Sequence, residues 1–120
     1  MAGRVFVVED DEDLRDSLAT LLRLEGYEVG TARNGSEALQ QLRESDPPCL
    51  ILLDLVMPMM DGWELCALLL GDQKLAVVPV VLLSGISDLE SWARTLGAVD
   101  YLTKPVEFDA VLTKVRLYCR

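Results

Sequence analysis

The chain alternates short apolar runs with longer segments that repeat apolar residues at helical spacing, over all of its 120 residues. Apolar runs of this length are typical of strands that are buried on both faces of a parallel sheet. Less apolar runs at 27–32 and 101–103 complete a set of five. The three most apolar runs lead into polar residues: Val5–Val8 precedes Glu9, Leu50–Leu53 precedes Asp54, and Val80–Leu83 precedes Ser84.

The segments between these runs carry helix start and stop signals. Asp13 is the expected N-cap of the first helix and Gly26 its stop, and Asn34 with Glu37 resembles a capping box for the second. Further helices are expected at 63–70, at 89–97 and from Phe108 onward. Five strand–helix units predict one doubly wound α/β domain over residues 1–120, with a five-stranded parallel sheet, helices on both faces and right-handed crossovers.

Composition excludes several classes of protein. Hydrophobic residues make up 51% of the chain and charged residues 26%, which is typical of a compact globular domain and not of a disordered one. The net charge of -9 argues against direct nucleic-acid binding, which needs clustered Lys and Arg. The sequence shows no membrane-spanning or secretion segment, so we expect a cytoplasmic protein that does not bind membranes.

The cysteine and histidine content limits which disulfides, metal sites and catalytic groups the chain can form. Cys49, Cys66 and Cys119 are odd in number and lack a CxxC spacing, so we expect neither a disulfide framework nor a zinc site. We interpret them as small buried hydrophobic residues in a reducing compartment. The chain contains no histidine, which excludes Ser/His/Asp catalysis and His-ligated metals. Any bound metal must therefore take oxygen ligands.

Three carboxylates are expected to meet at one edge of the sheet. Ligands of open α/β sheets bind beyond the carboxyl ends of the strands, and there adjacent first and third strands would bring Glu9, Asp10 and Asp54 together. Two carboxylates about 4 Å apart repel by about 4 kcal/mol at an effective dielectric constant of about 20. Taken alone, the acidic run after the first strand could equally be a solvated turn. Mg²⁺, which prefers oxygen ligands, is the expected counterion.

Residues after the fourth and fifth strands extend this site. Lys104 precedes Pro105, which keeps it extended, and it would supply a fixed positive charge to orient a phosphoryl group. Ser84 could donate a hydroxyl to the same oxygens, and Gly85 would leave room for a phosphate. Each of these residues taken singly is more often an ordinary surface or turn residue.

In combination the residues resemble a bacterial two-component response regulator receiver domain, over residues 4 to 118. Glu9-Asp10 is similar to the family's acidic pair, Asp54 to its phosphoacceptor, Met57-Pro58 with Asp61-Gly62 to the following loop, Ser84-Gly85 to its switch pair, Tyr101 to its switch aromatic, and Lys104-Pro105 to its Lys-Pro. The resemblance implies the flavodoxin-like strand order 2-1-3-4-5, for which a member of this family is a standard example. It assigns structural roles to Pro58, Gly62, Gly85 and Pro105.

The resemblance also implies a phosphotransfer chemistry. Asp54 would accept a phosphoryl group from a histidine kinase or histidine phosphotransfer protein, with Ser84 and Lys104 assisting. Asp10 and Asp54 would ligate Mg²⁺, Glu9 would act through water, and Val56 would offer its backbone carbonyl. The domain would catalyse its own phosphorylation and dephosphorylation, yet would be chiefly a signalling switch.

The same resemblance implies how the switch would signal. Phosphorylation would draw Ser84 inward and vacate space for the Tyr101 ring. The fourth helix, fifth strand and fifth helix would then contact an output domain or a downstream protein, or a second copy in a homodimer. Trp92 on that face is interpreted first as half-buried packing and second as a partner anchor.

The chain departs from the family pattern at some positions, and other functions compete with the receiver interpretation. Val56 and Ile86 are apolar where polar side chains often position the hydrolytic water, which predicts slow self-dephosphorylation. A Mg²⁺-dependent aspartate-nucleophile phosphohydrolase of the haloacid dehalogenase type would need a second acid at position 56. A degenerate receiver that only binds partners remains open, although every phosphorylation residue is present. Dinucleotide binding is excluded because no G-x-G-x-x-G occurs.

Overall fold

A computed structural model describes residues 3–119, which form five strands and five helices. The longest helix has 13 residues, and none in this range could cross a membrane. In chain order the elements are β1 (Arg4–Val8), α1 (Glu12–Leu24), β2 (Glu28–Ala32), α2 (Gly35–Glu44), β3 (Leu50–Asp54), α3 (Gly62–Leu70), β4 (Val80–Ser84), α4 (Leu89–Leu96), β5 (Asp100–Thr103) and α5 (Phe108–Tyr118).

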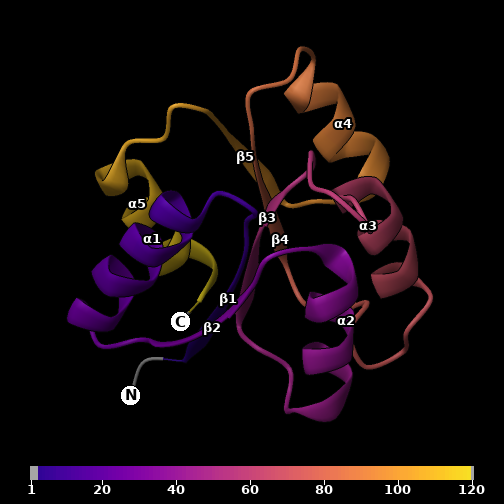
Figure 1. Cartoon of the computed structure of the whole chain (residues 1–120), viewed down its shortest axis with the longest axis horizontal. Coiled ribbons are helices and arrows are strands. Elements are labelled where there is room, and N and C mark those ends of the chain that lie inside the picture. Colours follow the sequence, from indigo (N-terminus) through magenta and orange to yellow (C-terminus); the bar gives the residue numbers. More distant parts are fainter. Residues whose placement is uncertain (1–2, 120) are drawn as a thin grey trace.

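The five strands form one parallel sheet in the order β2-β1-β3-β4-β5. Figure 1 shows α1 and α5 covering one face of this sheet, with α2, α3 and α4 on the other. The loops that follow β4 and β5 lie together at the top of that view, at the carboxyl edge of the sheet. The predicted doubly wound fold and strand order are confirmed.

Two apolar cores, one on each face of the sheet, hold the layers together. Phe6, Ile51 and Leu82 point into the core beneath α2, α3 and α4, whereas their neighbours Leu52 and Val81 point toward α1 and α5. This alternation follows from the two-residue period of a strand. The side chains of β3 are buried along the whole strand, as expected of a central strand covered on both faces.

Most helix boundaries agree with the sequence signals, with one correction. The N-cap of α1 is Asp11, whose carboxylate accepts a hydrogen bond from the Leu14 N–H, and not Asp13, which lies in the first turn. Asp11 is favoured because its extended backbone precedes the helix, as an N-cap requires. Asn34 caps α2 as predicted. Gly97, with φ +76°, ends α4 in the left-handed conformation that glycine tolerates.

The expectation that the chain lacks a disulfide is wrong. Cys49, directly before β3, and Cys119, directly after α5, are joined by a disulfide whose Cα atoms lie 5.1 Å apart. That separation suits the bond. No sequence pattern indicates this pair, because the two residues lie 70 positions apart and meet only once α5 packs on the sheet. Cys66 is a free buried thiol, as predicted, and burial raises its pKa to about 11.

We predict that reducing this disulfide lowers the free energy of unfolding by about 2 to 4 kcal/mol, because the unfolded chain regains the entropy of an open loop. Urea unfolding of the oxidised protein with and without dithiothreitol measures the difference. A Cys119→Ser variant is the control and should not respond to the reductant. Equal unfolding curves for the wild type under both conditions would contradict the prediction.

Candidate functional site

Glu9, Asp10 and Asp54 converge at the carboxyl edge of the sheet, with one carboxylate oxygen from each within 4.8 Å of the others. β1 and β3 are hydrogen-bonded neighbours in which Val8 pairs with Leu53, so the residues that follow both strands reach the same point. Every second side chain of β1 and β3 faces α1 and α5, and Glu9 and Asp54 are the next residues in these two series. Glu9 and Asp54 are buried, whereas Asp10 is exposed. The predicted meeting of the three acids is confirmed.

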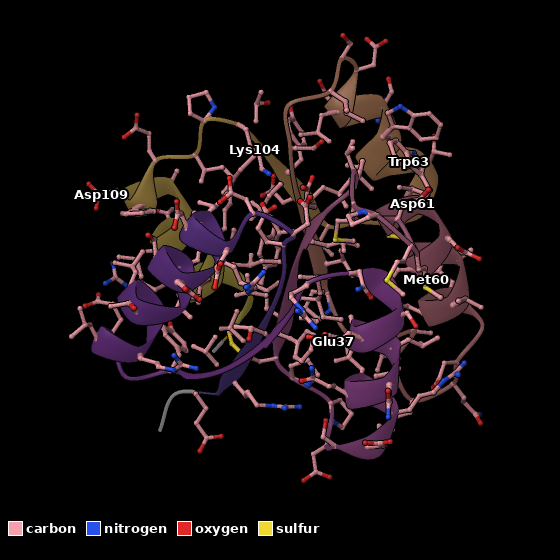
Figure 2. The ribbon with its side chains drawn as sticks, viewed as in Figure 1. Glu37, Met60, Asp61, Trp63, Lys104 and Asp109 are labelled. Carbon is pink, nitrogen blue, oxygen red and sulfur yellow. A yellow bond between two sulfur atoms is a disulfide. The ribbon has the colours of Figure 1, made fainter. Side chains whose placement is uncertain are left out.

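Lys104 supplies the positive charge at this edge. Its Nζ lies 2.7 Å from Glu9 Oε1 and 3.2 Å from Asp54 Oδ2. The Lys104 N–H donates to the carbonyl of Ser84, which ties the segment after β5 to the end of β4. Burial disfavours the charged ammonium, but the contact with Glu9 and the charges of Asp54 and Glu9 outweigh it and raise the pKa of Lys104. Figure 2 shows Lys104 among the loops at the top of the view, as the sequence predicted.

Glu9 is the most perturbed acid of the site. Its side chain is fully buried, and burial together with the nearby Asp54 charge raises its pKa to about 7 against the opposing effects of Lys104 and the Asp11 N–H. The Asp11 N–H donates to Glu9 Oε2 at 3.1 Å. Both carboxylate oxygens of Glu9 are therefore engaged within the protein, whereas the Asp10 carboxylate has no hydrogen bond to any described residue.

Ser84 and Gly85 lie beside the ion pairs. The Ser84 hydroxyl is buried and has no hydrogen-bond partner among residues 3–119. A buried hydroxyl without a partner costs free energy unless a ligand or water satisfies it. A side chain at Gly85 would contact only Lys104, with Cβ atoms 3.9 Å apart, so packing leaves open space at this position.

The loop between β3 and α3 is held close to Asp54. A Cβ atom at Gly62 would lie 2.6 Å from the Asp54 carbonyl oxygen, so only glycine allows this approach, and the Gly62 N–H donates to the Leu55 carbonyl. Asp61 caps α3 by accepting a hydrogen bond from the Glu64 N–H. The Val56 N–H donates to Asp54 Oδ1 at 3.3 Å, and the Val56 side chain is 54% exposed.

The sequence did not lead us to expect Arg15 at the functional site. This α1 residue is only 9% exposed, and its guanidinium donates to the backbone carbonyl of Glu9 at 3.0 Å. The signal was present, because Arg15 shares the spacing of Leu18 and Leu22 on the buried face of α1. A cation on an apolar stripe indicates a specific partner.

Aromatic residues lie on the α4 side of the molecule. Trp92 is 38% exposed and contacts the Trp63 ring edge-on, with ring centroids 5.5 Å apart. The interpretation of Trp92 as half-buried packing is thus confirmed. Trp63 lies in the first turn of α3, so this contact joins α3 to α4. Figure 2 labels Trp63 on the side of the molecule that carries α3 and α4. Tyr101 is partly buried on β5 and lines a depression of about 170 Å³ together with residues of α4.

The residues present fit a hard divalent cation. Carboxylates from two neighbouring strand ends converge, Asp10 is open to solvent, and the buried Ser84 hydroxyl lacks a partner. Mg²⁺ is usually held by one or two carboxylates, with waters and phosphate oxygens completing its coordination. An oxygen-only cluster that leaves ligand positions open matches that preference.

Residues 5–116 match the family description "Response regulator receiver domain". The chain belongs to this family. Receiver domains are the parts of two-component response regulators that act with histidine kinases and output domains. The fold, the strand order and the edge at which the acids meet all agree with that membership.

Similar proteins include DNA-binding regulators. This receiver domain is 37% identical to the response regulator MtrA of Mycolicibacterium smegmatis, over 100% of this chain and 52% of MtrA. It is 34% identical to the transcriptional regulator RpaA of a Synechocystis strain, over 98% of this chain and 49% of RpaA. The chain thus spans about half the length of these curated relatives.

Solved structures show the same fold. The receiver domain of a signal transduction histidine kinase from Syntrophus aciditrophicus matches with a TM-score of 0.87 and 36% identity, over 98% of this chain and 89% of that chain. The chemotaxis response regulator CheY4 of Vibrio cholerae matches with a TM-score of 0.90 and 26% identity, over 98% of this chain and 99% of that chain.

We predict that Glu9→Gln stabilises the metal-free receiver domain at neutral pH. Because the pKa of Glu9 is about 7 in the folded state against an ordinary 4.5, the folded state binds the extra proton between these values, and the wild type loses stability as pH rises through that window. Gln carries no such proton, so the variant should gain about 1 to 3 kcal/mol relative to wild type above pH 7.

Urea unfolding at several pH values in the presence of a chelator measures this difference. Glu44→Gln at the exposed end of α2 is the control substitution. A difference between Glu9→Gln and wild type that stays constant from pH 4.5 to 7 would contradict the assignment.

Proposed function

We propose that the protein accepts a phosphoryl group on Asp54 from the histidine of a histidine kinase or histidine phosphotransfer protein. The observation that carries the proposal is the position of Lys104, whose ammonium contacts both Glu9 and Asp54 at the carboxyl edge of the sheet. The absence of histidine from this chain is consistent with a donor imidazole on another protein.

The chemistry assigns one role to each side chain. A carboxylate oxygen of Asp54 attacks the phosphorus, a new O–P bond forms, and the bond from phosphorus to the donor nitrogen breaks. Lys104 stabilises the charge on the phosphoryl oxygens, and the unpartnered Ser84 hydroxyl donates a hydrogen bond to one of them. Catalysis thus consists mainly of positioning and charge neutralisation.

Mg²⁺ is the proposed cofactor. Asp10 and Asp54 would hold it directly, Glu9 through water and Val56 through its backbone carbonyl, and Pro58, Gly62, Gly85 and Pro105 would shape the surrounding loops. When bound, the ion would neutralise the excess negative charge of the acids and the incoming phosphate. Because both oxygens of Glu9 are already engaged with Lys104 and the Asp11 N–H, an indirect role suits Glu9.

The proposed output is a change on the face formed by α4, β5 and α5. A phosphoryl group on Asp54 would draw Ser84 toward it, and Tyr101, whose ring lies only partly buried beside α4, would move inward. That face would contact an output domain, a downstream protein or a second copy of the chain, with Trp92 as an additional anchor. We place this switching in the cytoplasm.

We predict that acetyl phosphate with Mg²⁺ adds one phosphoryl group per protein molecule, and that Asp54→Asn abolishes the adduct because it removes the nucleophile. Intact-protein mass spectrometry measures the adduct. Asp61→Asn is the matched control, since this exposed aspartate caps α3 and lies outside the acid cluster. A full adduct on Asp54→Asn would refute the assignment.

The same experiment separates the receiver from its rivals. Multiple turnovers of acetyl phosphate without an adduct would favour a Mg²⁺-dependent phosphohydrolase, and no reaction would favour a domain that only binds partners. The receiver is favoured over the phosphohydrolase because position 56 carries an exposed valine, which cannot act as the second acid.

We predict that Val56→Asn shortens the lifetime of the phosphorylated protein severalfold. A polar side chain two positions after Asp54 can orient the attacking water, which the valine cannot. Decay of the adduct after removal of acetyl phosphate measures the lifetime. Val77→Asn is the matched control, since Val77 is 81% exposed and lies outside the site. An unchanged or longer lifetime in Val56→Asn would contradict the prediction.

A further inference from the structure

We propose that Arg15 is a positioning residue that orients the acidic pair Glu9-Asp10 for Mg²⁺. The inference rests on the proposed function of the site and adds a residue that does not itself touch the metal or the phosphate. It starts from one contact, in which the buried guanidinium of Arg15 donates to the Glu9 carbonyl oxygen at 3.0 Å.

This contact replaces a strand partner that the Glu9 carbonyl lacks. β1 ends at Val8, and the Glu9 N–H still donates to the Ala32 carbonyl of β2 at 3.0 Å. The Glu9 carbonyl, by contrast, accepts from Arg15 and from no other described residue. The side chain of an α1 residue therefore completes the hydrogen bonding of β1 at the point where the chain leaves the sheet.

The peptide unit that Arg15 holds is the one that links the two acids. The Glu9 carbonyl, the Asp10 N–H and the Cα atoms of both residues belong to a single plane, so fixing the carbonyl restrains the points from which both side chains leave the backbone. Glu9 has further restraints from Lys104 and the Asp11 N–H. Within residues 3–119 the Asp10 carboxylate has no hydrogen-bond partner, so among these contacts only the restraint on its backbone helps to position it.

The environment of Arg15 supports a specific role. The residue is 9% exposed, and no carboxylate among the described residues forms an ion pair with it. Burying a cation on a neutral carbonyl costs free energy that a leucine at the same place would avoid. Groups that orient metal ligands are commonly retained at such a cost, and their removal typically weakens metal binding.

The test compares Mg²⁺ binding by calorimetry in wild type, Arg15→Met and Arg15→Lys. Met keeps the apolar stem and removes the donor, and we expect its dissociation constant for Mg²⁺ to rise about 10-fold. Lys keeps a donor and a charge and should restore part of the loss. Arg23→Met is the matched control, because Arg23 also lies on α1 and donates to a backbone carbonyl, that of Val29, away from the acids.

A kinetic measurement distinguishes positioning from a general structural effect. In Arg15→Met the Mg²⁺ concentration that half-saturates phosphorylation by acetyl phosphate should rise, while the rate at saturating Mg²⁺ should return to the wild-type value. A lower rate at saturation with unchanged half-saturation would overturn the inference. So would equal or tighter Mg²⁺ binding in Arg15→Met.

The behaviour of the wild type separates a failure of the proposed function from a failure of the inference about Arg15. If wild type itself fails to bind Mg²⁺, the proposed function of the site fails, and the inference about Arg15 fails with it. If wild type binds and Arg15→Met binds equally well, only the inference about Arg15 fails. Should Arg15→Met not fold, as judged by its circular dichroism melt, Arg15→Lys decides, since its compact ammonium lacks the planar fork of the guanidinium and predicts binding weaker than wild type.

Discussion

The ion-pair cluster at the carboxyl edge of the sheet is the constraint on which the rest of the site depends. Three carboxylates meet within 4.8 Å, two of them buried, and Lys104 offers one compensating charge. Burial and the nearby Asp54 charge raise the pKa of Glu9 to about 7, so this environment disfavours the full negative charge of all three acids. A site with this surplus of negative charge favours a divalent cation, which offsets the carboxylates before the phosphoryl oxygens add further negative charge.

The backbone around the cluster is tied to neighbouring elements by several close contacts. Gly62 brings the start of α3 against the end of β3, the Lys104 N–H donates to the Ser84 carbonyl, and Arg15 donates to the Glu9 carbonyl. Each contact joins a loop at this edge to a neighbouring element. Two of the groups that would bind ligands, Asp10 and the Ser84 hydroxyl, have no side-chain hydrogen-bond partner within residues 3–119. Such preorganisation lowers the cost of aligning ligands.

The opposite end of the molecule is fastened by different interactions. At the start of β5, the Asp100 carboxylate lies 2.7 Å from Lys114 Nζ and accepts a hydrogen bond from the Tyr118 hydroxyl at 2.9 Å. Cys119, which follows Tyr118, forms the disulfide with Cys49. The last turn of α5 is thus tied both to β5 and to the start of β3. On the other face, the contact between Trp63 and Trp92 links α3 to α4.

The sequence by itself determined the elements, their alternation and the chemical kind of the site. Apolar runs that end in Glu9, Asp54 and Ser84 predict parallel strands and an acidic edge, because strand ends and hydrophobic periodicity are local properties of the chain. The strand order came from the family resemblance. Tertiary structure alone decided the engagement of Glu9 with Lys104, the choice of the Glu9 carbonyl as the partner of Arg15, and the bond between Cys49 and Cys119. These depend on how distant segments pack, which local periodicity does not encode.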